Sequence, residues 1–371
     1  MRHLWSILIV LSGFSILPAN HVTNPNTPLK GQWSFNPRLI WQVDSANQEV
    51  FVRVGDIEVS ENGSIYIFER KYNKVIVLDA TGHYIHSFGK KGEGPGEFKW
   101  ANDVILFRDS VIIPEAGRAH FFSKNGVHQK TIRLPHRITP SHFISENSFV
   151  FYHNQIGKQG QIVADEIRSY NMDSKKNSLI SPFTAAKELH LDSGNMRLSV
   201  HVDDVHTCLN QDHLFMAKGD RYLVKVYSLR DKSITTFTIE DRQRKKISMA
   251  WKKAKYGHLK LNGQKMPESM IKKMITGMPD WSEFITRIVV DERGLIYTLV
   301  GDAENEITQE VDIFSPSGQY LYHGELRLPD NLKLASPDQL AIKNNFLYAF
   351  ATDEEDEGRI VKCRISLPTL K

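Results

Sequence analysis

Short hydrophobic segments alternate with polar turns along most of the chain, and the pattern is clearest from Val54 onward. Four hydrophobic segments follow one another between residues 54 and 89. They are separated by the turn sequences Glu-Asn-Gly at 61–63, Lys-Tyr-Asn-Lys at 71–74 and Thr-Gly at 81–82. Gly and Asn favour tight turns between antiparallel strands. This unit therefore predicts a four-stranded antiparallel sheet.

The unit recurs along the chain with decreasing clarity. We expect further copies at residues 103–134, 142–180, 206–239, 288–322 and 339–366. A four-stranded sheet cannot cover its own apolar faces, and a ring of such sheets solves this problem by packing each sheet against two neighbours. Six copies therefore predict an all-β fold, a six-bladed β-propeller. Residues 39–43 precede the first copy and are strand-like, so we expect them to complete the last blade and close the ring.

Parts of this pattern resemble a known repeat family. The segment Asn-Lys-Val-Ile-Val-Leu-Asp at 73–79 and the Phe-Gly at 88–89 resemble the NHL repeat, and the Gly-rich residues 91–98 are similar to its inter-blade linker. A blade that opens with Asp-Glu-Arg-Gly-Leu-Ile-Tyr at 291–297, after a helical insertion, looks like those of secreted bacterial six-bladed propellers. The resemblance implies an NHL-repeat-like propeller over about residues 36–368. It specifies fold far better than function, because propellers host many unrelated activities.

Residues 1–19 have the pattern of a secretory signal peptide. A short polar start precedes an apolar stretch at residues 4–17, and Pro18 and Ala19 follow it. The stretch is shorter than the ~20 residues that span the core of a bilayer. We therefore expect cleavage of this leader, no transmembrane span in the mature chain, and a secreted or periplasmic location. An uncleaved N-terminal anchor is the alternative; a lipid anchor would need Cys where this chain has Phe14.

Residues 240–282 interrupt the β pattern between the expected fourth and fifth blades. Residues 245–256 and 268–278 are rich in helix formers and have apolar positions on one face, so they predict a helical insertion. The insertion has eleven Lys and Arg residues against four Asp and Glu, a net charge of +7, whereas the whole chain of 371 residues carries +4. We therefore expect a basic insertion on a faintly acidic propeller, and export disfavours nucleic acid as its partner.

The apolar stripe of the insertion has two main interpretations. It contains Met270, Met274 and Met278 on the second expected helix, with Trp251 on the first. In one interpretation the stripe packs on the ring, and the Lys and Arg residues form a solvated face. In the other, the insertion is a lid or docking element, and these residues are partly exposed anchors for a partner. Binding to an anionic lipid or glycan is a third alternative.

Two groups of residues are candidates for a metal site. Glu93 lies in Gly-Glu-Gly-Pro, which is similar to a motif of calcium-dependent propeller lactonases, although a turn in the linker explains it better. His201, Asp203 and His206 are close in sequence, but their spacing matches no zinc pattern, and surface or core histidines explain them. We therefore expect no cofactor, with calcium or zinc as the alternative.

The sequence has no nucleophile elbow and no phosphate-binding loop, so we assign no catalytic residue. We expect an exported, non-catalytic binding or scaffold protein that uses a propeller surface for an unknown protein or small-molecule partner. The alternative is a metal-dependent propeller enzyme of the lactonase or lyase type, with its site near the central channel.

Overall fold

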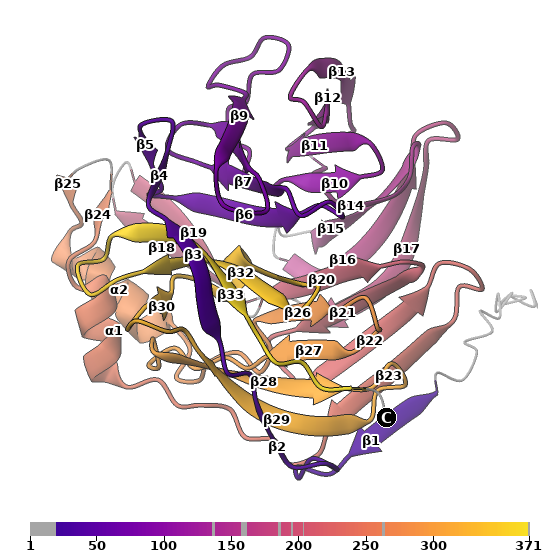
Figure 1. Ribbon diagram of the computed structural model, residues 1–371. Coiled ribbons are helices and arrows are strands. Elements are labelled where there is room, and N and C mark those ends of the chain that lie inside the picture. The colour runs from indigo at the N-terminus through magenta and orange to yellow at the C-terminus, as the bar shows by residue number, and fades with distance from the viewer. Residues whose placement is uncertain are drawn as a thin grey trace, which may run out of the picture.

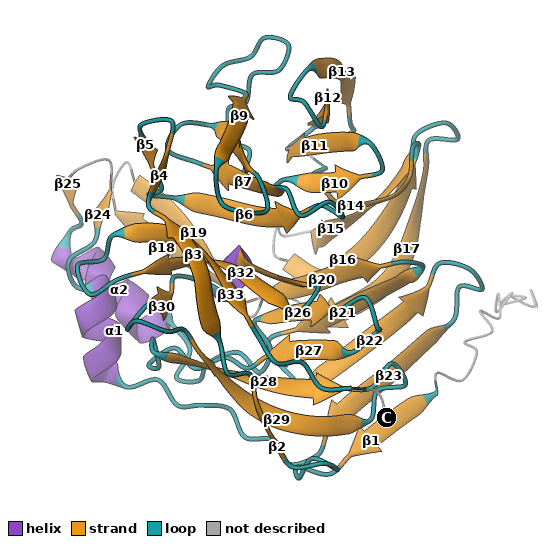
Figure 2. Ribbon diagram, in the orientation of Figure 1, coloured by secondary structure: helices purple, strands orange, loops and turns teal. Residues whose placement is uncertain are grey.

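The computed structural model describes residues 20–369 except 136–137, 157–161, 185–186, 194–195, 203 and 262–263, so the expected signal peptide lies outside the described residues. Six sheets of four or more strands make up most of the chain (Figures 1 and 2). The expected six-bladed β-propeller is confirmed.

The first three blades each have four strands. Blade one consists of β6 (Val54–Val59), β7 (Ile65–Glu69), β8 (Lys74–Leu78) and β9 (Tyr84–Phe88). Blade two consists of β10 (Ile105–Phe107), β11 (Ser110–Glu115), β12 (Arg118–Ser123) and β13 (His128–Arg133). Blade three consists of β14 (Pro140–Ser145), β15 (Ser148–Ile156), β16 (Ile162–Asn171) and β17 (Lys176–Thr184).

The last three blades each include a strand from the N-terminal part of the chain. Blade four consists of β20 (Val205–Asn210), β21 (His213–Lys218), β22 (Leu223–Ser228), β23 (Ile234–Ile239) and β1 (His21–Asn24). Blade five consists of β26 (Arg287–Val290), β27 (Ile296–Leu299), β28 (Thr308–Phe314), β29 (Tyr320–Arg327) and β2 (Gln32–Ser34). Blade six consists of β30 (Lys333–Leu334), β31 (Leu340–Lys343), β32 (Phe346–Thr352), β33 (Gly358–Arg364) and β3 (Arg38–Val43), with the short 3-10 helix η1 (Pro337–Gln339) before β31.

The innermost strands form a closed circle. Each contacts the next, in the order β6, β10, β14, β20, β26 and β31, and β31 contacts β6 again. The apolar cores lie between neighbouring blades; one cluster joins Ile57 and Ile67 of blade one to Tyr348 and Phe350 of blade six. Because both faces of a blade are covered, a middle strand such as β7 is buried at every residue. This is why its sequence is a continuous hydrophobic run without alternation.

The last blade is completed by β3, as expected from residues 39–43. This strand pairs antiparallel with β33, so that Leu39 lies opposite Cys363 and Val43 lies opposite Ile360. The indole Nε1 of Trp41 donates a hydrogen bond to the Ala80 carbonyl of blade one, at 3.1 Å. The N-terminal strand therefore joins the two ends of the ring and also contacts the first blade.

The strands β1 and β2 were not predicted from the sequence. Each adds in parallel to the outer strand of a blade, β1 to β23 and β2 to β29. The side chain of Asn24 links blades four and five, since its Nδ2 donates to the carbonyls of Thr238 (3.0 Å) and Gly318 (2.9 Å) and its Oδ1 accepts from the Tyr320 amide (2.9 Å). The N-terminal segment thereby covers two outer edges that would otherwise be open to pairing with another chain.

The connections between blades gather on one face of the ring, which we call the insertion face. Because each inner strand is entered from the outer strand of the preceding blade, these connections lie at the same end of the ring. They include the hairpins β4 (Ser45–Ala46) to β5 (Glu49–Val50), β18 (Lys187–Ser193) to β19 (Met196–Val202) and β24 (Lys260–Leu261) to β25 (Gln264–Lys265), and the helices α1 (Met249–Tyr256) and α2 (Glu268–Gly277). In Figure 1 all of them lie on the left of the molecule.

Truncation tests the closing role of β3. A chain that starts at residue 35 lacks β1 and β2, whereas one that starts at residue 45 also lacks β3. The shorter chain exposes an edge of β33 and the apolar surface beside it, so it should lose cooperative thermal unfolding, measured by circular dichroism. The chain from residue 35 should still unfold cooperatively at a moderately lower temperature. Equal behaviour of the two chains would contradict closure by β3.

The turn glycine Gly126 tests how neighbouring blades fit. It has a φ of +76°, and a Cβ at this position would lie 2.8 Å from Cδ1 of Phe88 in the preceding blade. Gly126→Ala should therefore cost about 2 kcal/mol of unfolding free energy. Gly31→Ala is the control, because Gly31 has a φ of +83° but nothing within 4 Å of the added Cβ, so about 1 kcal/mol is expected. Urea unfolding measures the free energy of unfolding of both variants. An equal loss in the two variants would show that the contact with Phe88 is unimportant.

Candidate functional site

The helical insertion is confirmed between blades four and five, where α1 and α2 lie. The helix α1 begins after Ser248, whose side-chain oxygen accepts the Trp251 amide at 3.1 Å and so caps the helix. The helix α2 follows Pro267 and ends at Gly277, before Met278 and Pro279. Pro279 cannot continue the helix, which explains why α2 ends two residues before it.

The apolar stripe of the insertion forms a small core of its own. The buried members are Met266, Met270, Ile271, Met274 and Ile275, with Tyr256, Leu259 and Met278 half-buried against them. The expected partial exposure is therefore wrong for Met270 and Met274, which are buried on α2, a helix that packs against both α1 and β18. Trp251 is half-buried and meets the Tyr256 ring edge-on, with 5.9 Å between ring centres. A role of these residues in binding a partner stays a prediction.

Basic residues of the insertion bind blade five. The Arg242 guanidinium lies 3.1 Å from Oδ2 of Asp312, which is fully buried, and Lys245 Nζ lies 2.7 Å from Oε1 of Glu310. Neither interpretation of the sequence foresaw this arrangement, in which the charged side chains hold the insertion to the ring and the apolar ones hold it together. Part of the +7 charge is thus neutralised by the propeller and does not form a solvated face.

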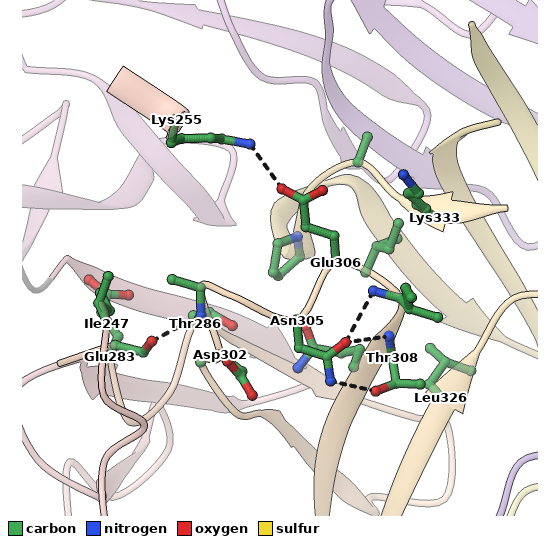
Figure 3. A pocket seen from close by; sticks show the side chains of 18 of the residues that line it. Ile247, Lys255, Glu283, Thr286, Asp302, Asn305, Glu306, Thr308, Leu326 and Lys333 are labelled. Carbon is green, nitrogen blue, oxygen red and sulfur yellow. Dashed lines mark hydrogen bonds and ion pairs between the residues drawn. The ribbon is translucent and has the colours of Figure 1, made fainter. Parts of the chain in front are cut away.

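A pocket of about 510 Å³ lies on the insertion face between the insertion, the β27–β28 loop and the connection from β29 to β31 (Figure 3). Apolar side chains come from all three parts and from the end of β29: Met278, Pro279, Trp281, Ile307, Leu326, Leu328 and Leu334. Trp281 keeps 47% of its surface exposed and Ile307 54%, which is high for such large apolar side chains. The pocket thus has an apolar surface that stays exposed to solvent in the folded chain.

Charged side chains surround this apolar surface. Lys255 of α1 reaches Glu306 of the β27–β28 loop, with 3.3 Å between Nζ and Oε1, and this ion pair joins the insertion to blade five beside the pocket (Figure 3). Lys333, Asp302 and Asp356 also line the pocket. Within the described part of the chain, no ion pair or side-chain hydrogen bond engages the Lys333 ammonium. The pocket therefore offers an available cation next to an apolar wall, and it has the carboxylates of Asp302 and Asp356 in addition to the paired Glu283 and Glu306.

A second group of polar side chains lies where the inner strands meet. We call it the ring centre, and it consists of Asp56, Glu58, His142, Cys208, Arg287 and Lys343. Burial, together with the nearby Asp56 carboxylate, raises the pKa of Glu58 to about 8, although Arg287 and Lys343 act in the opposite direction. Burial lowers the pKa of His142 to about 4 and raises that of Cys208 to about 11. All three groups are therefore mainly uncharged near neutral pH.

Of the candidate metal ligands, the structure describes the side chains of Glu93 and His206, and these two belong to different parts of the ring. Glu93 lies in the connection between blades one and two and pairs with Lys99, and His206 Nε2 lies 3.1 Å from Oε2 of Glu283. Asp203 and the side chain of His201 lie outside the described residues. Among the residues that the structure describes, no group of three His, Cys, Asp or Glu side chains is arranged to hold a metal ion.

Comparison with known proteins supports the architecture. Residues 45–198 match the model of a family described as a 6-bladed beta-propeller. A crystal structure of a candidate exported protein from Bacteroides fragilis is similar over 94% of this chain and 99% of its own, with a TM-score of 0.54 and 12% identity. The fold is that of a six-bladed β-propeller. At this level of identity the similarity concerns fold alone.

Two further structures show weaker similarity. A luciferin-regenerating enzyme covers 90% of this chain and 96% of its own, with a TM-score of 0.46 and 10% identity. Virginiamycin B lyase from Staphylococcus aureus covers 89% of this chain and 100% of its own, with a TM-score of 0.45 and 12% identity. No curated protein matches the chain. No helix among the described residues is long and apolar enough to cross a membrane.

The insertion core gives a direct test of its independence from the ring. Met270→Ala and Met274→Ala each remove buried side-chain volume, which costs about 2–5 kcal/mol in a packed core. We expect the double variant to speed amide hydrogen exchange in α1 and α2 while exchange in the inner strands of the blades stays unchanged. Faster exchange throughout the blades would show instead that the insertion is part of the ring's own core.

Proposed function

We propose that this chain is a non-catalytic binding protein that acts outside the cytoplasm and holds a short peptide, or a similar amphipathic zwitterion, in the pocket on the insertion face. The observation that carries this proposal is the combination of an exposed apolar wall with the available Lys333 ammonium in the same pocket. The extracytoplasmic location rests on the leader-like pattern of residues 1–19.

The apolar wall favours a ligand with a hydrophobic side chain. Pockets that bind small molecules have mainly apolar linings with a few placed polar groups, and their volumes run from roughly 300 to 1,000 Å³. The volume of about 510 Å³ falls within this range. Trp281 gives a broad rigid surface at low entropic cost, since an aromatic side chain has few rotatable bonds.

The charges favour a ligand that carries both signs. Lys333 suits a carboxylate, and Asp302 and Asp356 on the other pocket-lining loops suit an amine. A short peptide with free termini supplies both groups, with an apolar side chain between them. The two aspartates would repel a purely anionic ligand, and a purely cationic ligand would form no ion pair with Lys333.

Peptide binding is tested with tripeptides that have free termini and an apolar central residue. Binding should raise the melting temperature of the native protein, measured by differential scanning fluorimetry, since a ligand stabilises the state that binds it. Trp281→Ala and Lys333→Ala should each weaken this effect by about tenfold in peptide concentration. Trp100→Ala is the matched control, because Trp100 is 81% exposed in a different blade connection.

Peptides with acetylated and amidated ends provide the control on the ligand side, and they should bind more weakly because they lack both terminal charges. The proposal is wrong if no free tripeptide raises the melting temperature, or if Trp281→Ala and Trp100→Ala respond to the peptides in the same way.

A further inference from the structure

The guanidinium of Arg287 lies in the middle of the ring. Arg287 is the first residue of β26, the inner strand of blade five. It interacts electrostatically with Glu58 of β6, His142 of β14 and Cys208 of β20, which are inner strands of blades one, three and four. A group on one inner strand reaches three others only near the axis of the circle that these strands form.

The ring centre keeps contact with solvent. Protein atoms surround Glu58, His142 and Cys208 densely enough to shift their pKa values strongly, yet each of these side chains is only half-buried. Dense surroundings together with remaining exposed surface indicate a solvent-filled space enclosed by the ring. The pocket on the insertion face comes near this space, because Thr286, the residue before Arg287, lines that pocket.

The polar groups in this space are mostly hydrogen-bond donors. Arg287 brings a guanidinium to this space, and the planar fork of N–H groups in a guanidinium fits carboxylate and phosphate oxygens. Lys343 Nζ donates to the Val59 carbonyl at 3.1 Å and has further N–H groups. The carboxylate of Asp56 already accepts the amides of Ile57 (2.9 Å) and Val104 (3.2 Å).

The ring centre has a net positive charge when Glu58 is protonated. The two cations are Arg287 and Lys343, and the one remaining carboxylate is that of Asp56. A protonated Glu58 also donates a hydrogen bond, where an ionised one only accepts. We propose that the ring centre is a binding site for a small anion with a carboxylate or phosphate group, held by Arg287, Lys343 and the Glu58 carboxyl. This site is separate from the peptide pocket and does not depend on the function proposed for it.

The proposal implies a particular pH dependence. Among the described residues, Asp56 on the same strand, Arg287, Lys343 and Cys208 interact electrostatically with Glu58, and His142 interacts with Arg287. Tyr66 of β7 lies opposite Glu58, and burial raises the pKa of its phenol, so it stays protonated in this range; β10 contributes no titratable group. His142, with a pKa of about 4, and Cys208, with a pKa of about 11, keep one charge state between pH 6 and 9. Glu58, with a pKa of about 8, loses its proton in this interval. Anion binding should therefore be strong below pH 8 and weaken above it, since the ionised carboxylate repels an anion and no longer donates.

The experiment measures binding of acetate and of inorganic phosphate by isothermal titration calorimetry, at constant ionic strength with chloride as the background. The two anions distinguish a carboxylate site from a phosphate site. Arg287→Gln should weaken binding of the preferred anion at least tenfold at pH 6.5, because it removes the charged fork. Glu58→Gln should keep the affinity within about twofold at pH 6.5, since the amide still donates a hydrogen bond.

The decisive comparison is the pH profile of the Glu58→Gln variant. The native protein should lose about tenfold in affinity between pH 7 and pH 9, and the variant should lose less than twofold. If Arg287→Gln does not fold, this profile still decides the question, because it leaves Arg287 in place. Absence of binding by both anions, or an equal fall in affinity with pH in the native protein and the Glu58→Gln variant, would overturn the proposal. Trp281→Ala should leave anion binding unchanged, so failure of one site is distinguishable from failure of the other.

Discussion

The pairing of β3 with β33 is the interaction on which the rest of the structure depends. Each blade is apolar on both faces, so each needs a neighbour on both sides, and only a closed circle provides this for all six. The circle closes inside one sheet, where a strand from the start of the chain lies beside a strand from its end. Opening this sheet would expose the cluster between blades six and one, which includes Ile57 and Phe350.

Closure of the ring also places both candidate sites. It brings Glu58, His142 and Arg287 from different inner strands to one centre, although 229 residues separate the first from the last in sequence. The same circle sends the blade connections to one face, where the insertion binds blade five through Arg242 and Lys245. The pocket lies between this attached insertion and blades five and six, so its shape depends on ionic contacts as well as on apolar packing.

The repeat pattern predicted the ring well, because the local rules that make a blade are visible in the sequence. Turn glycines such as Gly63 and Gly82 and the strand at residues 39–43 could be found in this way. The strands β1 and β2 could not, since short edge strands have no hydrophobic run of their own. The insertion was predicted as helical, but burial of Met270 depends on how α2 packs against α1 and β18, which a stripe on one helix does not show.

The candidate sites were largely invisible in the sequence. No sequence pattern distinguishes Lys333 from the other lysines, and only the fold shows that it lines the same pocket as Trp281. Glu58 and Arg287 become a site only because inner strands of different blades converge, and no motif records this convergence. The one local signal is the alternation of Asp56 and Glu58 with apolar residues along an inner strand, and polar residues at such positions merit inspection in other propellers.

The most direct test of this account is a disulfide across the closing sheet. Leu39 lies opposite Cys363, and directly opposed residues on antiparallel strands are close enough for a disulfide bond. Cys363 is a free thiol, so Leu39→Cys supplies the missing partner. Mild oxidation of the folded variant should link residues 39 and 363, which mass spectrometry of the proteolysed chain detects as a peptide pair. A closed ring predicts nearly complete linkage that denaturation before oxidation abolishes, and two unlinked thiols in the folded variant would contradict it.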